Sequence, residues 1–189
     1  MTEQDVLGLL EETGALLTGH FELRSGLHSE RFFQCANLLR FPRKAEVLCK
    51  ALVENVKAAD IGKVDAVISP AVGGILVGHE VARAFDVMSI FAEKVDDRLV
   101  MRRFQIEKGT RYVIAEDVIT RGGRVQETID IVEAGGGEVA AIALLVDRSG
   151  GKVEFPYPTF SLFQMEPTVW DPKECPLCAQ GSEAVHPGS

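Results

Sequence analysis

The feature that most constrains the fold is an alternation of short apolar runs with helix-like segments between residues 64 and 146. Runs suitable for strands cover 64–69, 87–92, 112–115 and 139–146, and amphipathic segments cover 74–85 and 124–134. Strands separated by helices of about 11 residues are typical of βαβ crossovers in a parallel sheet. The pattern predicts an α/β fold with a mostly parallel central sheet flanked by helices.

Smaller additions are expected at both ends of this core. Residues 5–16 are predicted to form a helix with a capping box between Thr2 and Asp5, 21–26 a short strand and turn, and 43–57 an amphipathic helix. Residues 93–109 interrupt the pattern as a charged loop or mobile hairpin, and 160–165 is the last expected strand. We therefore predict one domain over 1–171 and an irregular tail over 172–189.

Composition argues against several classes of protein. A formal charge of −8 over 189 residues makes a broad basic surface for nucleic acid improbable. Apolar runs stay shorter than the roughly 18 residues of a membrane-spanning helix, and the N-terminal residues lack the basic and apolar regions of a signal peptide. The expectations are a cytoplasmic protein, no nucleic-acid partner and no membrane association.

The cysteines fall into two groups. Cys35 and Cys49 stand alone in segments expected to be ordered and are predicted to be buried thiols. Cys175 and Cys178 form the sequence CPLC, which is half of a typical zinc site. His186 could supply a third ligand, and no fourth is evident in the sequence. The alternative is a reduced pair in the tail.

The segment 112–125 carries the clearest chemical signal. An apolar strand ends in Glu116 and Asp117, and a turn with Thr120, Gly122 and Gly123 leads directly into a helix. Free N–H groups at the start of a helix favour phosphate, and acids beside them suit sugar hydroxyls or Mg²⁺. The segment therefore predicts a site for a phosphorylated sugar. The alternative is that the acids cap a helix and the glycines only form a tight turn.

This segment resembles the phosphoribosyl pyrophosphate (PRPP) signature of the type I phosphoribosyltransferases, an apolar strand with two acids and V-x-T-x-G-G. Other stretches resemble the orotate-using members of that family: 21–29 with the aromatic pair after it, 69–74, 91–94 and 146–150. The resemblance covers roughly residues 1–165. It implies the type I phosphoribosyltransferase fold, with residues from about 1 to 40 forming a hood over the base.

The resemblance also implies a reaction. Ribose 5-phosphate would pass from PRPP to orotate, giving orotidine 5′-phosphate and pyrophosphate in pyrimidine biosynthesis, with Mg²⁺ as cofactor. The alternatives are a PRPP-dependent transferase for another base and a PRPP-sensing regulator. A cation at Arg148 favours orotate, because the carboxylate of this base needs a cationic partner whereas a neutral purine does not.

Individual roles follow from the resemblance. Lys94, Glu116 and Asp117 are the candidate catalytic residues, and Asp117 is a candidate protein ligand for Mg²⁺ carried by PRPP. Orotate is expected against Phe32, Phe33, Thr120 and Arg148. The expected PRPP contacts are Ala71, Val72, Gly73, Lys94, Glu116, Asp117, Val118, Ile119, Thr120, Arg121, Gly122, Gly123 and Arg124.

Two of these assignments have structural alternatives. Arg148 without the resemblance would be an arginine paired with Asp147 at the end of a strand. Phe32 and Phe33 are adjacent, so in an extended chain they face opposite ways and at most one is expected to stack on the base.

The chain also departs from the family pattern. His28 stands where many members have Lys, and Gly73 stands where a basic residue is common. The mobile loop is short, with arginines over 95–104, so the pyrophosphate contacts are expected to pass to Arg102 or Arg103. The resemblance implies a homodimer in which this loop, with Lys94, completes the site of the neighbouring subunit.

Overall fold

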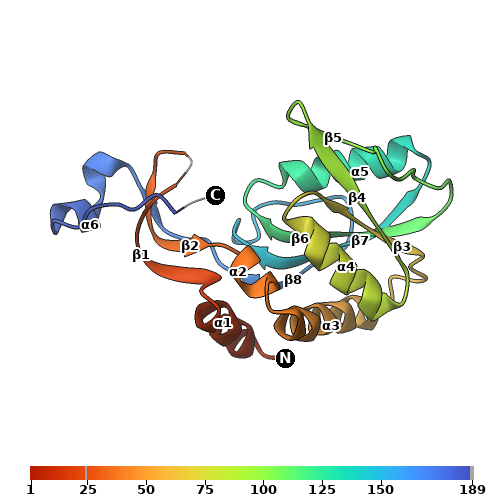
Figure 1. Ribbon diagram of the computed structural model, residues 1–189, viewed down its shortest axis with the longest axis horizontal. Helices are drawn as coiled ribbons and strands as arrows, with labels where there is room; N and C mark the ends of the chain where they lie inside the picture. The colour runs from red at the N-terminus through yellow and green to blue at the C-terminus, as the bar shows by residue number, and fades with distance from the viewer. Residues whose placement is uncertain (24, 188–189) are drawn as a thin grey trace.

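The structure, a computed structural model, describes residues 1–23 and 25–187, so Arg24 of the 21–29 stretch lies outside the described residues. Within this part of the chain the central sheet contains β3 (Ala66–Pro70), β4 (Met88–Val95), β5 (Arg98–Val100), β6 (Arg111–Ile119), β7 (Glu138–Asp147) and β8 (Thr159–Gln164). Their order is β5-β4-β3-β6-β7-β8 (Figure 1). The neighbouring strands are parallel, apart from the antiparallel β4–β5 pair. The predicted α/β fold is confirmed.

Helices cover both faces of this sheet (Figure 1). The helices α1 (Glu3–Glu12), α2 (Ala36–Leu39), α3 (Pro42–Ala58) and α4 (Gly74–Phe85) contribute to the apolar core on one face, and α5 (Gly123–Ala134) packs on the other. The strand β7 is buried along nearly its whole length. Burial on both faces explains why its sequence is a continuous apolar run rather than an alternating one.

The helices at the sheet agree closely with the prediction, and the N-terminal helix does not. The helix α4 spans the predicted residues 74–85, and α5 begins one residue before the predicted start. The capping box is confirmed, since the Thr2 hydroxyl accepts from the backbone N–H of Asp5 at 3.2 Å. However, α1 ends at Glu12 rather than at residue 16, because Gly14 takes a left-handed φ of 68° and the N–H groups of Gly14 and Ala15 donate back to the carbonyls of Glu11 and Leu10 at 3.0 Å and 2.8 Å.

A second, antiparallel sheet lies beside the main sheet, on the left in Figure 1. Its described strands are β1 (Leu16–Glu22), β2 (His28–Phe33) and β9 (Val169–Trp170), in the order β1-β2-β9. From here on, the hood means these three strands, which add β9 to the β1 and β2 segments of the stretch expected over about 1–40. The short strand and turn predicted over 21–26 are found in part: the strand begins earlier, at Leu16, and ends at Glu22, and the N–H of Gly26 donates to the Leu23 carbonyl at 2.8 Å in the turn. The third strand of the hood, β9, comes from residues 169–170 and was not predicted.

The 93–109 interruption is a hairpin at its beginning. The strand β4 continues to Val95, Asp96 and Asp97 turn with φ of 46° and 65°, and β5 returns antiparallel. After β5 the chain has no strand or helix up to residue 110, yet Met101, Phe104 and Ile106 pack against the core on the α5 side.

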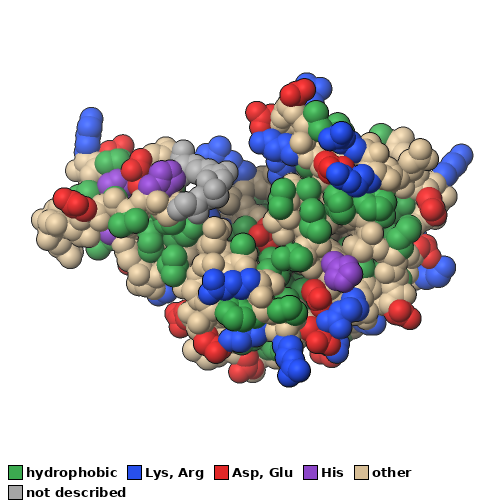
Figure 2. Space-filling model, in the orientation of Figure 1, with side chains coloured by type: hydrophobic (Ala, Val, Ile, Leu, Met, Phe, Trp, Pro, Cys, Tyr) green, Lys and Arg blue, Asp and Glu red, His purple; other side chains and the backbone are tan. Residues whose placement is uncertain are grey.

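The tail is more ordered than the prediction of an irregular segment. It contains a 3₁₀ turn, η1 (Pro172–Glu174), and a one-turn helix, α6 (Pro176–Ala179), and Val185 then pairs with Phe21 of the hood. None of the helices in the described residues is long and apolar enough to cross a membrane. On the face shown in Figure 2, lysines and arginines are interspersed with acidic side chains.

Candidate active site

The sheet order places the candidate site at one edge. From β3 the chain continues to β4 on one side, whereas the next parallel strand, β6, lies on the other side of β3. In open α/β sheets such a reversal leaves a crevice at the carboxyl ends of the strands, where ligands bind. The loops 71–73 and 120–122 follow β3 and β6 at this edge. These loops are the two segments expected to contact PRPP.

The loop after β6 opens the first turn of α5. Gly122 is the N-cap residue with φ of 70°, and it makes no side-chain capping bond. A Cβ on Gly122 would lie 2.7 Å from Phe155 Cζ and 2.7 Å from Val153 Cγ1, whereas a Cβ on Gly123 would meet no described atom within 4 Å. The backbone therefore packs closely on one side and stays open on the other, as a phosphate cradle at a helix N-terminus requires.

The two acids at the end of β6 lie against the loop after β3. A Cβ on Gly73 would be 2.9 Å from Asp117 Oδ2, and one on Gly74 would be 2.9 Å from Glu116 Oε1. The carboxylates also accept backbone N–H groups within the strand, from Asp117 to Glu116 Oε1 at 3.1 Å and from Val118 to Asp117 Oδ1 at 2.8 Å. Neither acid caps α4 or α5, so the helix-cap alternative is wrong.

Burial dominates the electrostatics of this pair. It raises the pKa of Glu116 well above its usual value, and the neighbouring Asp117 carboxylate raises it further. Burial also raises the pKa of Asp117. Among the described residues neither carboxylate forms an ion pair. The site therefore holds two closely spaced acids that a cation or sugar hydroxyls would stabilise.

A cavity of about 880 Å³ lies between the hood and the loop after β6. It is lined by residues of the hood, of the strand ends and of the tail: Leu23, Ser25, Phe32, Phe33, Gln34, Val118, Thr120, Arg121, Arg148, His186 and Pro187. An adjoining cavity of about 500 Å³ shares Thr120, Arg121 and Arg148. The volumes suit small-molecule ligands. All four residues expected to contact orotate line the larger cavity.

Arg148 is the charged group that distinguishes this cavity. Burial lowers the pKa of its guanidinium, and its Nε is buried with no hydrogen-bond partner in the described structure. Its Cζ lies 5.5 Å from the centre of the Phe33 ring. The alternative pairing with Asp147 is wrong, because that carboxylate accepts from Ser149, Gly151 and the side chain of Gln164 instead. Arg148 is thus a partly buried cation available to an anion in the cavity.

Of the aromatic pair, at most one ring was expected to stack on the base and the other to lie in the core. Both Phe32 and Phe33 line the cavity. Phe33 is 4% exposed and packs toward Phe163 at a centroid distance of 6.3 Å, and the Phe32 ring lies 5.8 Å from that of Phe21. Phe33 therefore belongs to the core and to the cavity wall at once.

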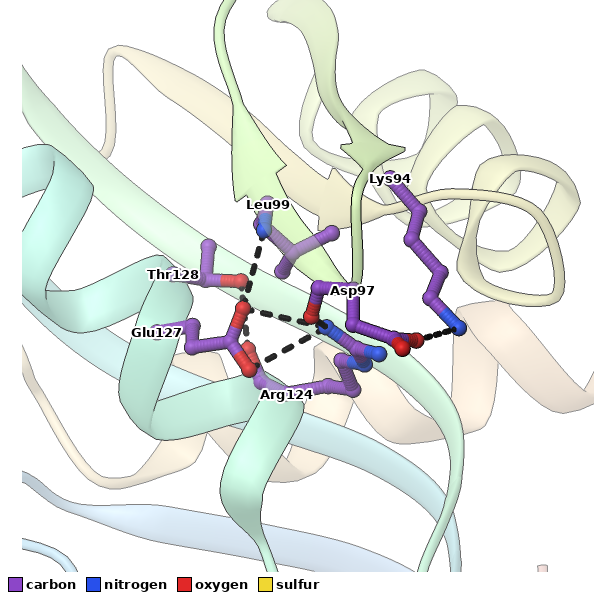
Figure 3. A network of polar contacts seen from close by, with 6 residues as sticks. All are labelled: Lys94, Asp97, Leu99, Arg124, Glu127 and Thr128. Carbon is purple, nitrogen blue, oxygen red and sulfur yellow. Dashed lines mark hydrogen bonds and ion pairs between the residues drawn. The ribbon is translucent and has the colours of Figure 1, made fainter.

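Lys94 is not in either cavity of its own chain. Its Nζ lies 2.5 Å from Asp97 Oδ1 across the β4–β5 hairpin, and its side chain is half exposed (Figure 3). The Asp97 carbonyl accepts from Arg124 Nη1 at 2.9 Å, and Glu127 of α5 accepts from both Arg124 and the backbone N–H of Leu99. These bonds fasten the hairpin to the first turns of α5.

Two of the expected PRPP residues have side chains that are engaged elsewhere in the fold. The Arg124 guanidinium is engaged with Glu127 and Asp97, and the side chain of Ile119 is buried in the core. Val72 is 82% exposed and precedes Gly73, the glycine that lies against the Asp117 carboxylate. Thr120 and Arg121 are exposed and line both cavities.

The two arginines considered as replacement contacts differ in their surroundings. Arg103 forms an ion pair with Glu93 on β4, and Arg102 forms no ion pair among the described residues. Neither lines the two cavities described above. Sequence reasoning missed His186 and Pro187 as cavity residues, and no local signal could have found them, since their position depends on the pairing of Val185 with the hood.

Comparison with known proteins identifies the family. A family model described as phosphoribosyl transferase domain matches residues 37–179. The orotate phosphoribosyltransferase of Heliobacterium modesticaldum is 46% identical over 190 aligned residues, covering 100% of this chain and 99% of the relative.

Solved structures agree on the fold, and they do not distinguish an enzyme that uses orotate from one that uses adenine. Orotate phosphoribosyltransferase from Aeropyrum pernix has a TM-score of 0.65 at 24% identity, over 84% of this chain and 93% of that one. Adenine phosphoribosyltransferase from Rhodothermus marinus also has a TM-score of 0.65, at 21% identity, over 86% of this chain and 99% of that one. The full-length sequence relatives decide the assignment: the chain belongs to the orotate phosphoribosyltransferases of the phosphoribosyl transferase domain family.

Proposed function

We propose that this protein transfers the ribose 5-phosphate group of PRPP to orotate, releasing pyrophosphate and forming orotidine 5′-phosphate in pyrimidine biosynthesis. The observation that carries the choice of base is Arg148, a partly buried guanidinium with no anionic partner among the described residues. A carboxylate on a flat pyrimidine would supply that partner, and the aromatic wall formed by Phe32 and Phe33 suits the ring. A neutral purine would leave the cation unpaired.

The 5′-phosphate is assigned to the loop 120–123. Backbone N–H groups at the start of α5 and the positive end of its dipole favour an anion there, and the Thr120 hydroxyl can donate a further hydrogen bond. Gly123 leaves open space beside this backbone. Because Thr120 also lines the cavity with Arg148, the phosphate and the base would occupy adjoining parts of one site.

Glu116 and Asp117 are assigned to the ribose and to Mg²⁺. Carboxylate oxygens are ligands that Mg²⁺ prefers, and the pair lies beside the side-chain-free backbone of Gly73, so the donor set fits this ion. When bound, Mg²⁺ supplies positive charge to the pyrophosphate leaving group. The carboxylates accept hydrogen bonds from ribose hydroxyls and face the positive charge that develops on the ring. The backbone of Ala71, Val72 and Gly73 lies next to the pyrophosphate in this arrangement.

The chemistry needs positioning more than proton transfer. The bond from the anomeric carbon to pyrophosphate breaks, and a ring nitrogen of ionised orotate donates its electron pair to the same carbon. The ionised ring is already a sufficient nucleophile, so no strong base is required. The work of the protein is to align the two substrates, exclude water and neutralise the departing charge.

Lys94 is proposed to act in a homodimer. Within its own chain it lies on an exposed hairpin and lines neither cavity, which supports a role in a neighbouring subunit. A two-fold arrangement would place the hairpin of each subunit at the other subunit's site. Arg102 or Arg103 of the same segment would join it. The cytoplasmic location stays a prediction.

The experiment that tests this function compares Arg148→Ala with Lys152→Ala. Lys152 lines the adjoining cavity and is ion-paired with Glu166 at 2.5 Å, so it is a basic residue of the same region with its charge already satisfied. Loss of a buried charged partner costs roughly 2 kcal/mol or more, so Arg148→Ala should raise the KM for orotate by at least about 30-fold. The KM for PRPP should change much less, and Lys152→Ala should leave both nearly unchanged.

Pyrophosphate release measured with orotate, uracil, hypoxanthine and adenine in parallel completes the test. Orotate should be the substrate, and Arg148→Ala should reduce its advantage over uracil, which lacks the carboxylate. Equal rises in both Michaelis constants, or turnover of a purine by the wild type, would remove Arg148 from the base site and contradict the proposed substrate. Arg148→Ala should remain folded, because the change removes a buried cation without breaking an ion pair.

A further inference from the structure

Two histidines and two cysteines converge at the outer end of the hood. His20 lies on β1, His28 on β2, and Cys175 and Cys178 at the start and within α6 of the tail, which lies beside the hood in Figure 1. One potential ligand atom from each side chain lies within 4.8 Å of all the others. His20, His28 and Cys175 are 7%, 8% and 2% exposed, and Cys178 closes the cluster on its solvent side.

Most of the distances between neighbouring ligand atoms are close to those of a tetrahedral zinc centre. Zn–N bonds near 2.05 Å and Zn–S bonds near 2.3 Å at tetrahedral angles place two nitrogens about 3.4 Å apart and a nitrogen and a sulfur about 3.6 Å apart. In the structure, His20 Nε2 and His28 Nδ1 are 2.9 Å apart. Cys175 Sγ lies 3.4 Å and Cys178 Sγ 3.8 Å from His20 Nε2, and Cys178 Sγ lies 3.4 Å from His28 Nδ1.

The remaining nitrogen of His20 is held as in metal-bound histidines. Its Nδ1 lies 3.1 Å from the carbonyl oxygen of Ser182 and 3.2 Å from the Ser182 hydroxyl. A carbonyl can only accept, so Nδ1 carries the proton and donates to it. The lone pair of Nε2 is then directed at the cluster, which is the usual way an outer hydrogen bond sets the tautomer of a ligating histidine.

Hydrogen bonds alone satisfy this cluster poorly. Both thiols and His28 Nδ1 lie within hydrogen-bonding reach of His20 Nε2, whose single lone pair accepts one good hydrogen bond. The other polar atoms would be left with weak contacts in a largely buried place, which is unfavourable. A metal ion accepts all four electron pairs together, and thiolate with imidazole selects zinc rather than Mg²⁺.

We propose that His20, His28, Cys175 and Cys178 bind one Zn²⁺ ion as a closed structural site. Four protein ligands leave no open position for a water or substrate, so the ion fixes structure rather than performing chemistry. It joins both long strands of the hood to the tail. The same tail pairs with β1 at Val185 and carries His186 and Pro187 into the wall of the larger cavity.

His186 is therefore not the third ligand that the sequence suggested. The zinc centre holds the segment that brings His186 to the cavity, and the two cysteines obtain their partners from β1 and β2 instead. This inference rests on the cluster alone and does not depend on the proposed reaction.

The test measures the metal directly. Full-length protein purified without chelators should contain about one zinc ion per chain by mass spectrometry, and Co²⁺ in its place should give the intense visible bands of tetrahedral cobalt–thiolate coordination. Cys178→Ser, chosen for its exposed position, should lose most of the zinc after dialysis against EDTA and should lose the cobalt bands. Cys49→Ala, a buried cysteine outside the cluster, and His186→Ala should retain both.

A second readout follows the tail. Removing zinc from the wild type should speed limited proteolysis within residues 172–187, and adding zinc back should restore protection. The proposal is overturned if the wild type binds neither zinc nor cobalt at stoichiometric level, if Cys178→Ser retains its zinc, or if thiol counting on the unfolded protein finds the CPLC cysteines joined in a disulfide. If Cys178→Ser does not fold, the wild-type cobalt spectrum decides by itself.

Discussion

Gly122 and Gly123 are adjacent, but a Cβ on Gly122 would clash with packed side chains, whereas a Cβ on Gly123 would lie in open space. Substituting each by alanine therefore separates an effect on stability from an effect on ligand binding. Gly122 has φ of 70°, and a Cβ there would lie 2.7 Å from both Phe155 Cζ and Val153 Cγ1. Gly123 lies in the first turn of α5, and its Cβ would meet no described atom within 4 Å. Gly122→Ala should therefore damage the fold, and Gly123→Ala should damage the phosphate site.

The magnitude for Gly122→Ala has two parts. A left-handed backbone costs an alanine roughly 1–2 kcal/mol, and forcing a methyl group against packed side chains costs about 1–3 kcal/mol more. The sum, about 2–5 kcal/mol, corresponds to a fall in Tm of roughly 4–20 °C for a chain of this size. Thermal and urea unfolding followed by circular dichroism measure this loss.

Gly123→Ala serves as the matched partner. Its stability should stay within about 1 kcal/mol of the wild type, on the stabilising side, because alanine restricts the unfolded chain. The added methyl group would occupy the open space beside the backbone and keep the phosphate from one of its hydrogen bonds. Losing one charge-assisted hydrogen bond should raise the Kd for PRPP at least about tenfold, as measured by calorimetric titration. Wild-type stability in Gly122→Ala, or unchanged PRPP affinity in Gly123→Ala, would refute the description of this loop.

Asp117→Asn should cut turnover at least about tenfold with the fold intact. Burial raises the pKa of Asp117 in the folded state, so the protonated carboxyl contributes stability at low pH, and this contribution is lost as pH rises through the folded pKa. The Asn variant lacks this group, so between acid and neutral pH its free energy of unfolding in urea titrations should fall less than that of the wild type. A mixture of the Lys94→Ala and Asp117→Ala variants, unfolded and refolded together, should regain roughly a quarter of wild-type activity, because about half the dimers are mixed and each mixed dimer has one intact site. No recovery of activity, or a monomer in sedimentation, would place Lys94 in its own chain's site. Leu52→Ala, fully buried on α3, should cost about 2–5 kcal/mol in urea unfolding, and a loss below 1 kcal/mol would contradict the packing of that helix.

The central sheet was predictable from the sequence because its signals are local. The helix over 74–85 has an apolar face with the right spacing, and the run over 139–146 is apolar because both of its faces are buried. The acids at the end of β6 were predictable for the same reason: a parallel strand ends at the ligand edge, whatever lies elsewhere in the chain.

The hood and the cluster at its end were not predictable in this way. β2 pairs with β9 through His28 and Trp170, and no periodicity within either segment indicates that partner. No local signal links His20 to His28, because their neighbours in the cluster, Cys175 and Cys178, lie about 150 residues away in the sequence. The N-terminal helix was extended too far because its apolar spacing continues past Gly14, whose left-handed backbone ends it.

The pairing of β2 with β9 has a consequence for the order in which the protein is completed. Ser29 and Val169 are neighbours in the hood, although the whole central sheet lies between them in the sequence. Contacts between such distant positions form slowly, because a long chain must first be brought together. During synthesis β1 and β2 leave the ribosome before β9, and the side of β2 that later receives β9 stays an unpaired edge until β9 emerges. An unpaired edge can join the edge of another chain. Expression at low temperature or with a chaperone should therefore improve the yield of this protein, because it shields a strand whose partner is made much later.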